Sequence, residues 1–164
     1  MKKIFNIALV LVVLISVSII GLSKVEAKEI NIPEATGYVV DTINLLNNSI
    51  KQEIETICKN LDSSAQMAVL IIDTSQPYSI EQYSIAVAEK WKVGYKGKDN
   101  GVILIVAKSD RKVRIEVGRG LEDRLNDATA GKIINNVIIP SFKAGDFNAG
   151  ILNGVKAIQK EILK

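Results

Sequence analysis

The sequence predicts an α/β fold in which helices pack on a mixed β-sheet. Two near-continuous apolar runs of strand length, 66–72 and 102–107, predict buried strands. Between them lies a helical segment that starts at the capping box 79–82, and a helix between two strands predicts a parallel crossover. The alternating segment 112–117 follows the second run after a short turn. This order predicts one crossover and one hairpin within the same sheet.

The elements before the first apolar run are shorter. Residues 28–33 are expected to form a short tether, and 38–41 a brief extended piece. Residues 47–49 contain helix-capping side chains, and an apolar stripe with helical spacing predicts a helix that ends near Leu61. Cys58 lies on this stripe, so a buried thiol is favoured over an intermolecular disulfide.

The elements after the first strand have clear start and stop signals. Gly94 is expected to end the helix that begins at the capping box, and Pro140 is expected to end a later helix. Asp127 and Asp146 are the predicted N-caps of the two helices that follow the hairpin. Trp91 has helical spacing with the apolar face of its helix, so a core position is favoured over an exposed docking role.

The first 27 residues read as an export signal. A basic start is followed by the apolar run 4–22 and by the small-residue pattern that ends at Ala27. Cleavage after Ala27 is expected, and the alternative is an uncleaved membrane anchor with its N-terminus inside the cell. In both cases the body is extracytoplasmic. The predicted organisation is a signal peptide or anchor at 1–27, a tether at 28–37 and one domain at 38–164.

Composition excludes several classes of function. The chain of 164 residues has no His and one Cys, so a His-based triad, a His-ligated zinc or haem site, a Cys-rich metal site and an intrachain disulfide are all excluded. No zinc or haem cofactor is expected. The formal net charge of +3 falls to +1 without the export segment, because three Lys and one Glu lie in 1–27. Such a small charge does not indicate nucleic acid as a partner.

Chain direction predicts which polar residues share an end of the sheet. The loop 95–101 should lie at the same end as 122–127, while Asp73 and Asp110 should lie at the opposite end. Oxygen ligands at the first end suit Ca²⁺ or Mg²⁺. The alternative is that these residues form turns, caps and solvated surface, and the EF-hand pattern is absent. The residues that offer oxygen ligands at this end are Asp99, Asn100, Glu122, Asp123 and Asp127.

The segment 118–123 contains two glycines but has Asp123 where a dinucleotide loop needs a third. A carboxylate there would repel a pyrophosphate, so no nucleotide cofactor is expected. Positive φ angles where the strand leaves the sheet are the favoured reason for the two glycines.

Several motifs, in this order along the chain, resemble the TPM domain family. The segments that carry the resemblance are Asp41 with Leu45–Leu46, Trp91–Gly94, Lys96–Val102, Arg114–Glu122, Asp127–Ala128, Ile139–Phe142 and Gly145–Phe147. The resemblance implies a sandwich with a small central sheet between helices, on the non-cytoplasmic side of a membrane. It also implies calcium binding or acid phosphatase activity, as in some members of a family that includes a thylakoid-lumen protein linked to photosystem II repair. Carried onto the matching positions, the resemblance implies Asp41, Asp99, Asn100, Glu122 and Asp127 as the predicted metal ligands.

Two positions depart from the family pattern: Arg119 stands where Tyr is common, and Asp123 where Gly is common. Two hypotheses follow. The first is an accessory module that assists a membrane or envelope protein, with Ca²⁺ ordering its acidic loops. The second is a metal-assisted acid phosphatase, in which Asp99 or Asp127 acts as nucleophile or base because no His is present.

Overall fold

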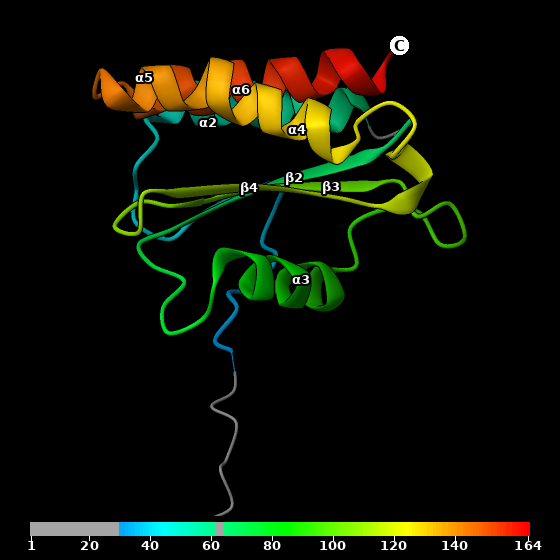
Figure 1. Cartoon of the computed structure of the whole chain (residues 1–164), viewed down its shortest axis with the longest axis horizontal. Helices are drawn as coiled ribbons and strands as arrows, with labels where there is room; N and C mark the ends of the chain where they lie inside the picture. Colours follow the sequence, from blue (N-terminus) through cyan, green and yellow to red (C-terminus); the bar gives the residue numbers. More distant parts are fainter. Residues whose placement is uncertain (1–29, 62–63) are drawn as a thin grey trace, which may run out of the picture.

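Four strands form one mixed sheet in the order β1-β2-β3-β4 (Figure 1). The computed structural model describes residues 30–61 and 64–164, so the predicted export segment lies outside the described residues. β1, β2 and β3 are parallel, and β4 is antiparallel to β3, which confirms the expected hairpin. Within the described part of the chain, no helix is long and apolar enough to cross a membrane. The strands are β1 Val39–Asp41, β2 Gln66–Ile72, β3 Gly101–Ala107 and β4 Lys112–Val117.

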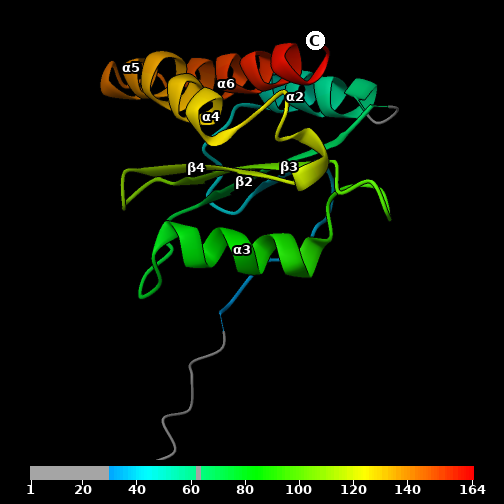
Figure 2. The same ribbon diagram turned by 45° about the vertical axis from the view of Figure 1, so that its right-hand side comes forward.

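The structure has two parallel crossovers, one more than the sequence predicts, because the extended piece at its start is a strand. Helix α2, Asn48–Leu61, connects β1 to β2, and helix α3, Ile80–Trp91, connects β2 to β3. The two helices lie on opposite faces of the sheet although both connections move in the same direction across it (Figure 2). The two crossovers therefore have opposite hands, and one of them is the rarer left-handed kind.

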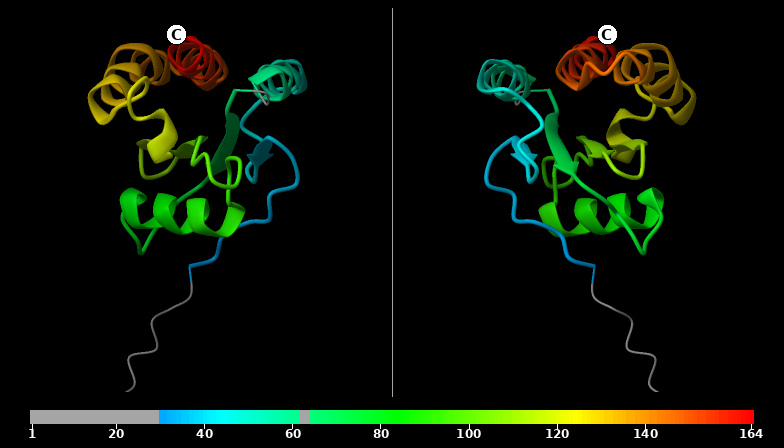
Figure 3. Two further views of the ribbon diagram at one scale, coloured as in Figure 1. Left: turned by 90° about the vertical axis from the view of Figure 1, so that its right-hand side faces the viewer. Right: turned by 90° about the vertical axis from the view of Figure 1, so that its left-hand side faces the viewer.

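Both faces of the central strands are buried, which explains their near-continuous apolar sequences. Val69 and Leu104 point into the core under α2 and α6, whereas Leu70 and Ile105 point towards α3. Helix α6, Phe147–Ile162, packs beside α2 on the first face. Figure 3 shows this arrangement end-on, with α3 alone on the other face. The predicted sheet between helices is confirmed.

The chain continues as a helix through Pro140, contrary to the expected stop. Helix α4, Asp127–Ile133, passes into the π-helical segment η2, Ile134–Ile138, and then into α5, Ile139–Lys143. The Ile139 N–H donates to the Ile134 carbonyl, five residues earlier. Proline has no N–H and crowds the preceding turn. In a π-helical turn each N–H bonds to the carbonyl of the fifth preceding residue, not the fourth, so the turn is wider. This wider turn gives room for the proline ring and does not need its missing N–H.

The observed helix caps agree only in part with those predicted from the sequence. The capping box of Ser79 and Gln82 is present, and Asp146 caps α6 through the N–H of Ala149. Lys92 takes the left-handed position at the end of α3, with φ of 52°, in place of Gly94. Cys58 is fully buried, as expected, and burial with the nearby Glu55 charge raises the pKa of its thiol to about 12.

The described part of the predicted tether packs along α3 before the chain enters β1. Ile32 is buried, and three side chains of α3 donate hydrogen bonds to successive main-chain carbonyls of this segment. We call residues 30–34 the strap. The bonds run from Tyr83 Oη to Asn31 at 3.1 Å, from Lys90 Nζ to Ile32 at 2.8 Å and from Trp91 Nε1 to Pro33 at 2.8 Å.

Candidate functional site

Two loops meet where β3 begins and β4 ends, as chain direction predicts. The Gly118 N–H donates to the Gly101 carbonyl at 2.8 Å, and the Gly120 N–H donates to the Asp99 carbonyl at 2.9 Å. The Asp99 carboxylate accepts from the Arg119 N–H at 3.2 Å. The backbone after β4, including the short 3₁₀ turn η1 at Arg119–Leu121, is thus tied to the loop before β3.

The two glycines after β4 are required by contact distance, not by positive φ. Gly118 has φ of −70°, which any residue can adopt. A Cβ atom at Gly118 would lie 2.2 Å from the Asp99 carbonyl oxygen, and one at Gly120 would lie 2.0 Å from that of Lys98. The expected positive φ at these glycines is therefore wrong. Their role is to let two backbone segments touch.

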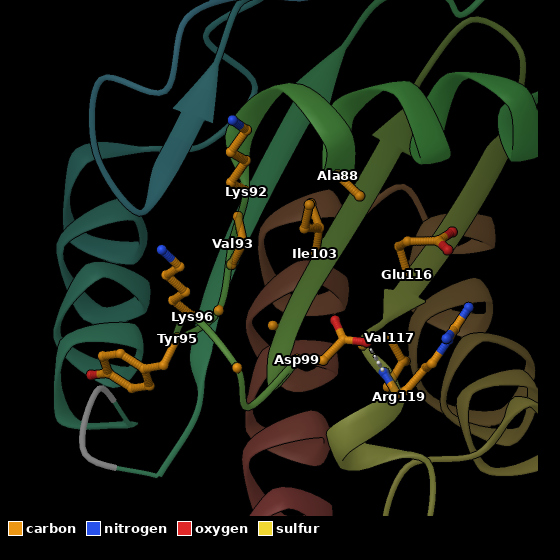
Figure 4. Close-up of a pocket in the computed structure, with 14 residues that line it drawn as sticks. Ala88, Lys92, Val93, Tyr95, Lys96, Asp99, Ile103, Glu116, Val117 and Arg119 are labelled. Carbon is orange, nitrogen blue, oxygen red and sulfur yellow. Dashed lines mark hydrogen bonds between the residues drawn. The ribbon is translucent and has the colours of Figure 1, made fainter.

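A cavity of about 550 Å³ opens beside this contact, between the end of α3 and the end of β4. Its charged lining residues are Lys92, Lys96, Asp99, Glu116 and Arg119. Figure 4 shows Asp99 and Arg119 at one side of the cavity and the two lysines at the other. The exposed Asp99 thus shares a cavity with three basic side chains. Such a cavity suits a ligand with an anionic group.

Glu116 is a site residue that the sequence did not single out. Its Oε2 accepts hydrogen bonds from the buried Ser84 hydroxyl at 2.8 Å and from Arg114 Nε at 3.1 Å. Alternation along β4 already places Glu116 on the face opposite Ile115. Ser84 lies one position after Tyr83, on the apolar face of α3. Only the packing of α3 on β4 brings these two polar groups together.

A second cavity, of about 480 Å³, lies along the other side of β4. It is lined by β4 residues Arg114–Val117 and by Glu122, Asn126 and Asp127. The N-cap of α4 is Asn126, whose side chain accepts from the Thr129 N–H at 2.9 Å, so the prediction for Asp127 is wrong by one residue. Asp127 lies in the first turn instead, and its carboxylate is exposed.

The five predicted metal ligands do not form one site. Asp41 lies at the opposite end of the sheet, where its two oxygens accept from the N–H groups of Ile43 and Leu46. Asn100 is buried, and its amide bonds the Tyr95 N–H and the Ser64 carbonyl. Among the described residues, no group of three or more His, Cys, Asp or Glu side chains could hold a metal ion.

The other three predicted ligands do not all lie in the same cavity. Asp99 lines the first, whereas Glu122 and Asp127 line the second. The two residues predicted as catalytic candidates, Asp99 and Asp127, therefore do not share a cavity.

The opposite end of the sheet contains Asp73 and Asp110, as predicted. Asp73 accepts from the Ser109 hydroxyl at 2.6 Å, and Asp110 accepts from the Ser75 N–H and the Thr74 hydroxyl, both at 2.7 Å. Burial acts to raise the pKa of Asp110, but these hydrogen bonds outweigh it and hold the pKa below its ordinary value. Both carboxylates are thus engaged in joining the loop after β2 to the hairpin turn.

Comparison with known proteins shows which family the chain belongs to. The family model described as the TPM domain, and named for a phosphatase, matches residues 39–161. The chain belongs to the TPM domain family. Among proteins with curated descriptions, none matches it.

Three solved structures are similar to this TPM domain. The N-terminal domain of a protein from P. gingivalis is 30% identical with a TM-score of 0.72, covering 78% of this chain and 83% of that one. The N-terminal domain of cg2496 from Corynebacterium glutamicum is 15% identical with a TM-score of 0.60, covering 79% and 82%. BA42 from Bizionia argentinensis is 17% identical with a TM-score of 0.59, covering 74% and 84%. The last two likenesses support the fold alone.

We expect Gly118→Ala to lower the free energy of unfolding by about 2–3 kcal/mol, because the new methyl group overlaps the Asp99 carbonyl. Urea denaturation of the two proteins measures this difference. Gly131→Ala is the matched control: nothing lies within 4 Å of its new methyl group, and it should raise stability by about 0.5–1 kcal/mol as a helical substitution. Equal stability of Gly118→Ala and the parent chain would contradict the close backbone contact.

Proposed function

We propose that this TPM domain is an exported binding module that works at the outer face of a membrane and assists a membrane or envelope protein. The observation that carries the proposal is the strap, because it holds the start of the domain on α3 through three hydrogen bonds. Seven residues separate Leu22, the end of the apolar run, from Ile30 at the start of the strap.

This spacing limits how far the domain can lie from a retained anchor. The eight residue-to-residue steps from Leu22 to Ile30 span at most roughly 26–29 Å when fully extended. An anchored chain would therefore hold α3 and the neighbouring cavity of about 550 Å³ close to the membrane surface. A cleaved chain would lack this restraint. The arrangement supports action on a partner at the membrane, with the loop 95–101 as the contacting region.

We expect a photo-cross-linking residue at Lys96 to capture a membrane or envelope protein in living cells, because Lys96 is exposed and lines the cavity. The matched control is Lys160, which is exposed on α6 at the other face of the sheet. Adducts are separated by gel electrophoresis and identified by mass spectrometry. A chain recovered only from the cytosolic fraction, or the same adducts from both positions, would contradict the proposal.

Of the five predicted metal ligands, we keep Glu122 and Asp127 for the proposed calcium site. These exposed carboxylates line the same cavity, and within the described residues neither forms a hydrogen bond or ion pair. Two carboxylates with water are a suitable partial shell for a hard cation. Asp41 and Asn100 are less suitable because backbone groups already occupy their oxygens.

We expect Ca²⁺ titration to shift NMR signals of residues 115–117 and 122–128, and Glu122→Gln with Asp127→Asn to abolish the shifts. Asp41→Asn is the control and should leave them unchanged. Shifts centred on the turn after Asp41, or none at millimolar Ca²⁺, would contradict this placement.

A second candidate function is acid phosphatase activity, favoured by the three basic residues around Asp99. Lys92, Lys96 and Arg119 could offset the charge of a phosphoryl group, and the exposed Asp99 carboxylate could act as nucleophile or base. No step is assigned to Asp127, because it lines the other cavity.

If this activity exists, Asp99→Asn should lower kcat/KM for p-nitrophenyl phosphate by about 100-fold or more. The assay is run with and without Mg²⁺, and Asp123→Asn is the control, since Asp123 lines neither cavity. Equal hydrolysis by the Asp99→Asn variant and the parent chain would contradict a role for this cavity in catalysis.

A further inference from the structure

We propose that the free edge of β4 binds an extended segment of a partner protein that carries lysine or arginine at alternate positions, and that this segment adds as a fifth strand. The inference deepens the proposed binding role by naming the chemistry of the partner, and it rests on that role. Its evidence is the hydrogen-bond register of β4, the cavity along that strand and the charge of the cavity wall.

The register leaves one side of the β4 backbone unpaired. The Gly118 N–H donates to the Gly101 carbonyl, so the residues at alternate positions before Gly118, namely Lys112, Arg114 and Glu116, are the ones that bond to β3. The intervening residues are Val113, Ile115 and Val117. Their N–H and C=O groups point away from β3. In the described part of the chain, β4 pairs with no other strand.

This edge lacks several of the features that usually protect edge strands, although Lys112, Arg114 and Glu116 place charged side chains along it. β4 pairs with β3 over six residues without a bulge, and it contains no Pro or Gly. The other edge strand, β1, has only three residues. Edges are normally shortened, bulged, covered or lined with charged side chains, because unpaired backbone groups recruit further strands. Of these, β4 has only the charged side chains along its length. The length of the open β4 edge therefore points to a partner strand.

The cavity of about 480 Å³ gives this partner room. One wall is β4 itself, and the other is the segment from Glu122 to Ala128. Figure 3 shows the edge of the sheet lying between α4 on one face and α3 on the other. A folded second copy would have to bring its own two helices to this edge. A single extended chain needs only about 4.8 Å beside β4, so it is the better occupant.

The charge of the cavity wall selects the kind of chain. Side chains of an added strand that lie opposite Ile115 and Val117 point to the same face as those two residues. On that face stand the carboxylates of Glu122 and Asp127, which form no ion pair among the described residues. Basic side chains at alternate positions of the partner can reach these carboxylates, whereas acidic ones would be repelled.

The test uses the full chain in non-ionic detergent with EDTA, so that no calcium bridge contributes. The probe is a seven-residue peptide of alternating Lys and Val with blocked ends and a fluorescent label. We expect saturable binding by fluorescence anisotropy, with NMR shifts centred on 113–117. The same peptide with Glu in place of Lys should bind at least about tenfold more weakly. A Lys-Val peptide N-methylated at alternate residues should not bind, because it cannot form the backbone ladder.

Charge-reversal variants locate the binding. Glu122→Lys with Asp127→Lys should weaken binding of the Lys-Val peptide at least about tenfold. Asp123→Lys, which changes the same charge outside the cavity, should leave binding unchanged. Circular dichroism verifies that each variant is folded.

Three outcomes would overturn the proposal: no binding, equal binding of the Lys and Glu peptides, or shifts away from β4. Sedimentation showing a dimer through β4 that the peptide does not displace would assign the edge to a second copy and would also overturn it. The assay contains no membrane partner, so its failure leaves the membrane proposal standing. Failure of the Lys96 cross-linking experiment would likewise leave the peptide result unaffected.

Discussion

The contact between two backbone segments at one end of the sheet is the constraint on which both candidate sites depend. Gly118 and Gly120 lie so close to the carbonyls of Asp99 and Lys98 that no side chain fits between them. The contact holds the chain as it leaves β4 against the loop that enters β3. It thereby defines where each cavity begins, since Val117 and Glu116 line both.

The same contact separates the charges of the molecule into two chemical environments. On the α3 side, Asp99 and Glu116 share a cavity with three basic side chains, and the proposed ligand there carries an anionic group. On the α4 side, Glu122 and Asp127 line a cavity beside β4, and the proposed ligands there are a cation or basic side chains. The two cavities that share β4 are therefore proposed to bind ligands of opposite charge. This suits a module that contacts more than one kind of partner.

Much of the fold could be predicted, because each central strand is buried on both faces and reads as an apolar run. Chain direction also predicted that Asp99 would lie near the residues after β4. Sequence spacing could not show that Asn100 is turned inward to bond its own loop, since exposed and buried amides have the same sequence signal. The π-helical turn before Pro140 could not be predicted either, because a proline has the same sequence signal whether the helix ends there or continues through a wider turn.

Amide hydrogen exchange along β4 and the following loop of the free protein tests the central claim most directly. The account predicts slow exchange at Arg114, Glu116, Gly118 and Gly120, whose N–H groups are bonded, and fast exchange at the intervening Val113 and Val117. Uniform protection along β4 would show that its edge is already covered. Fast exchange at Gly118 and Gly120 would contradict the backbone contact from which both cavities are built.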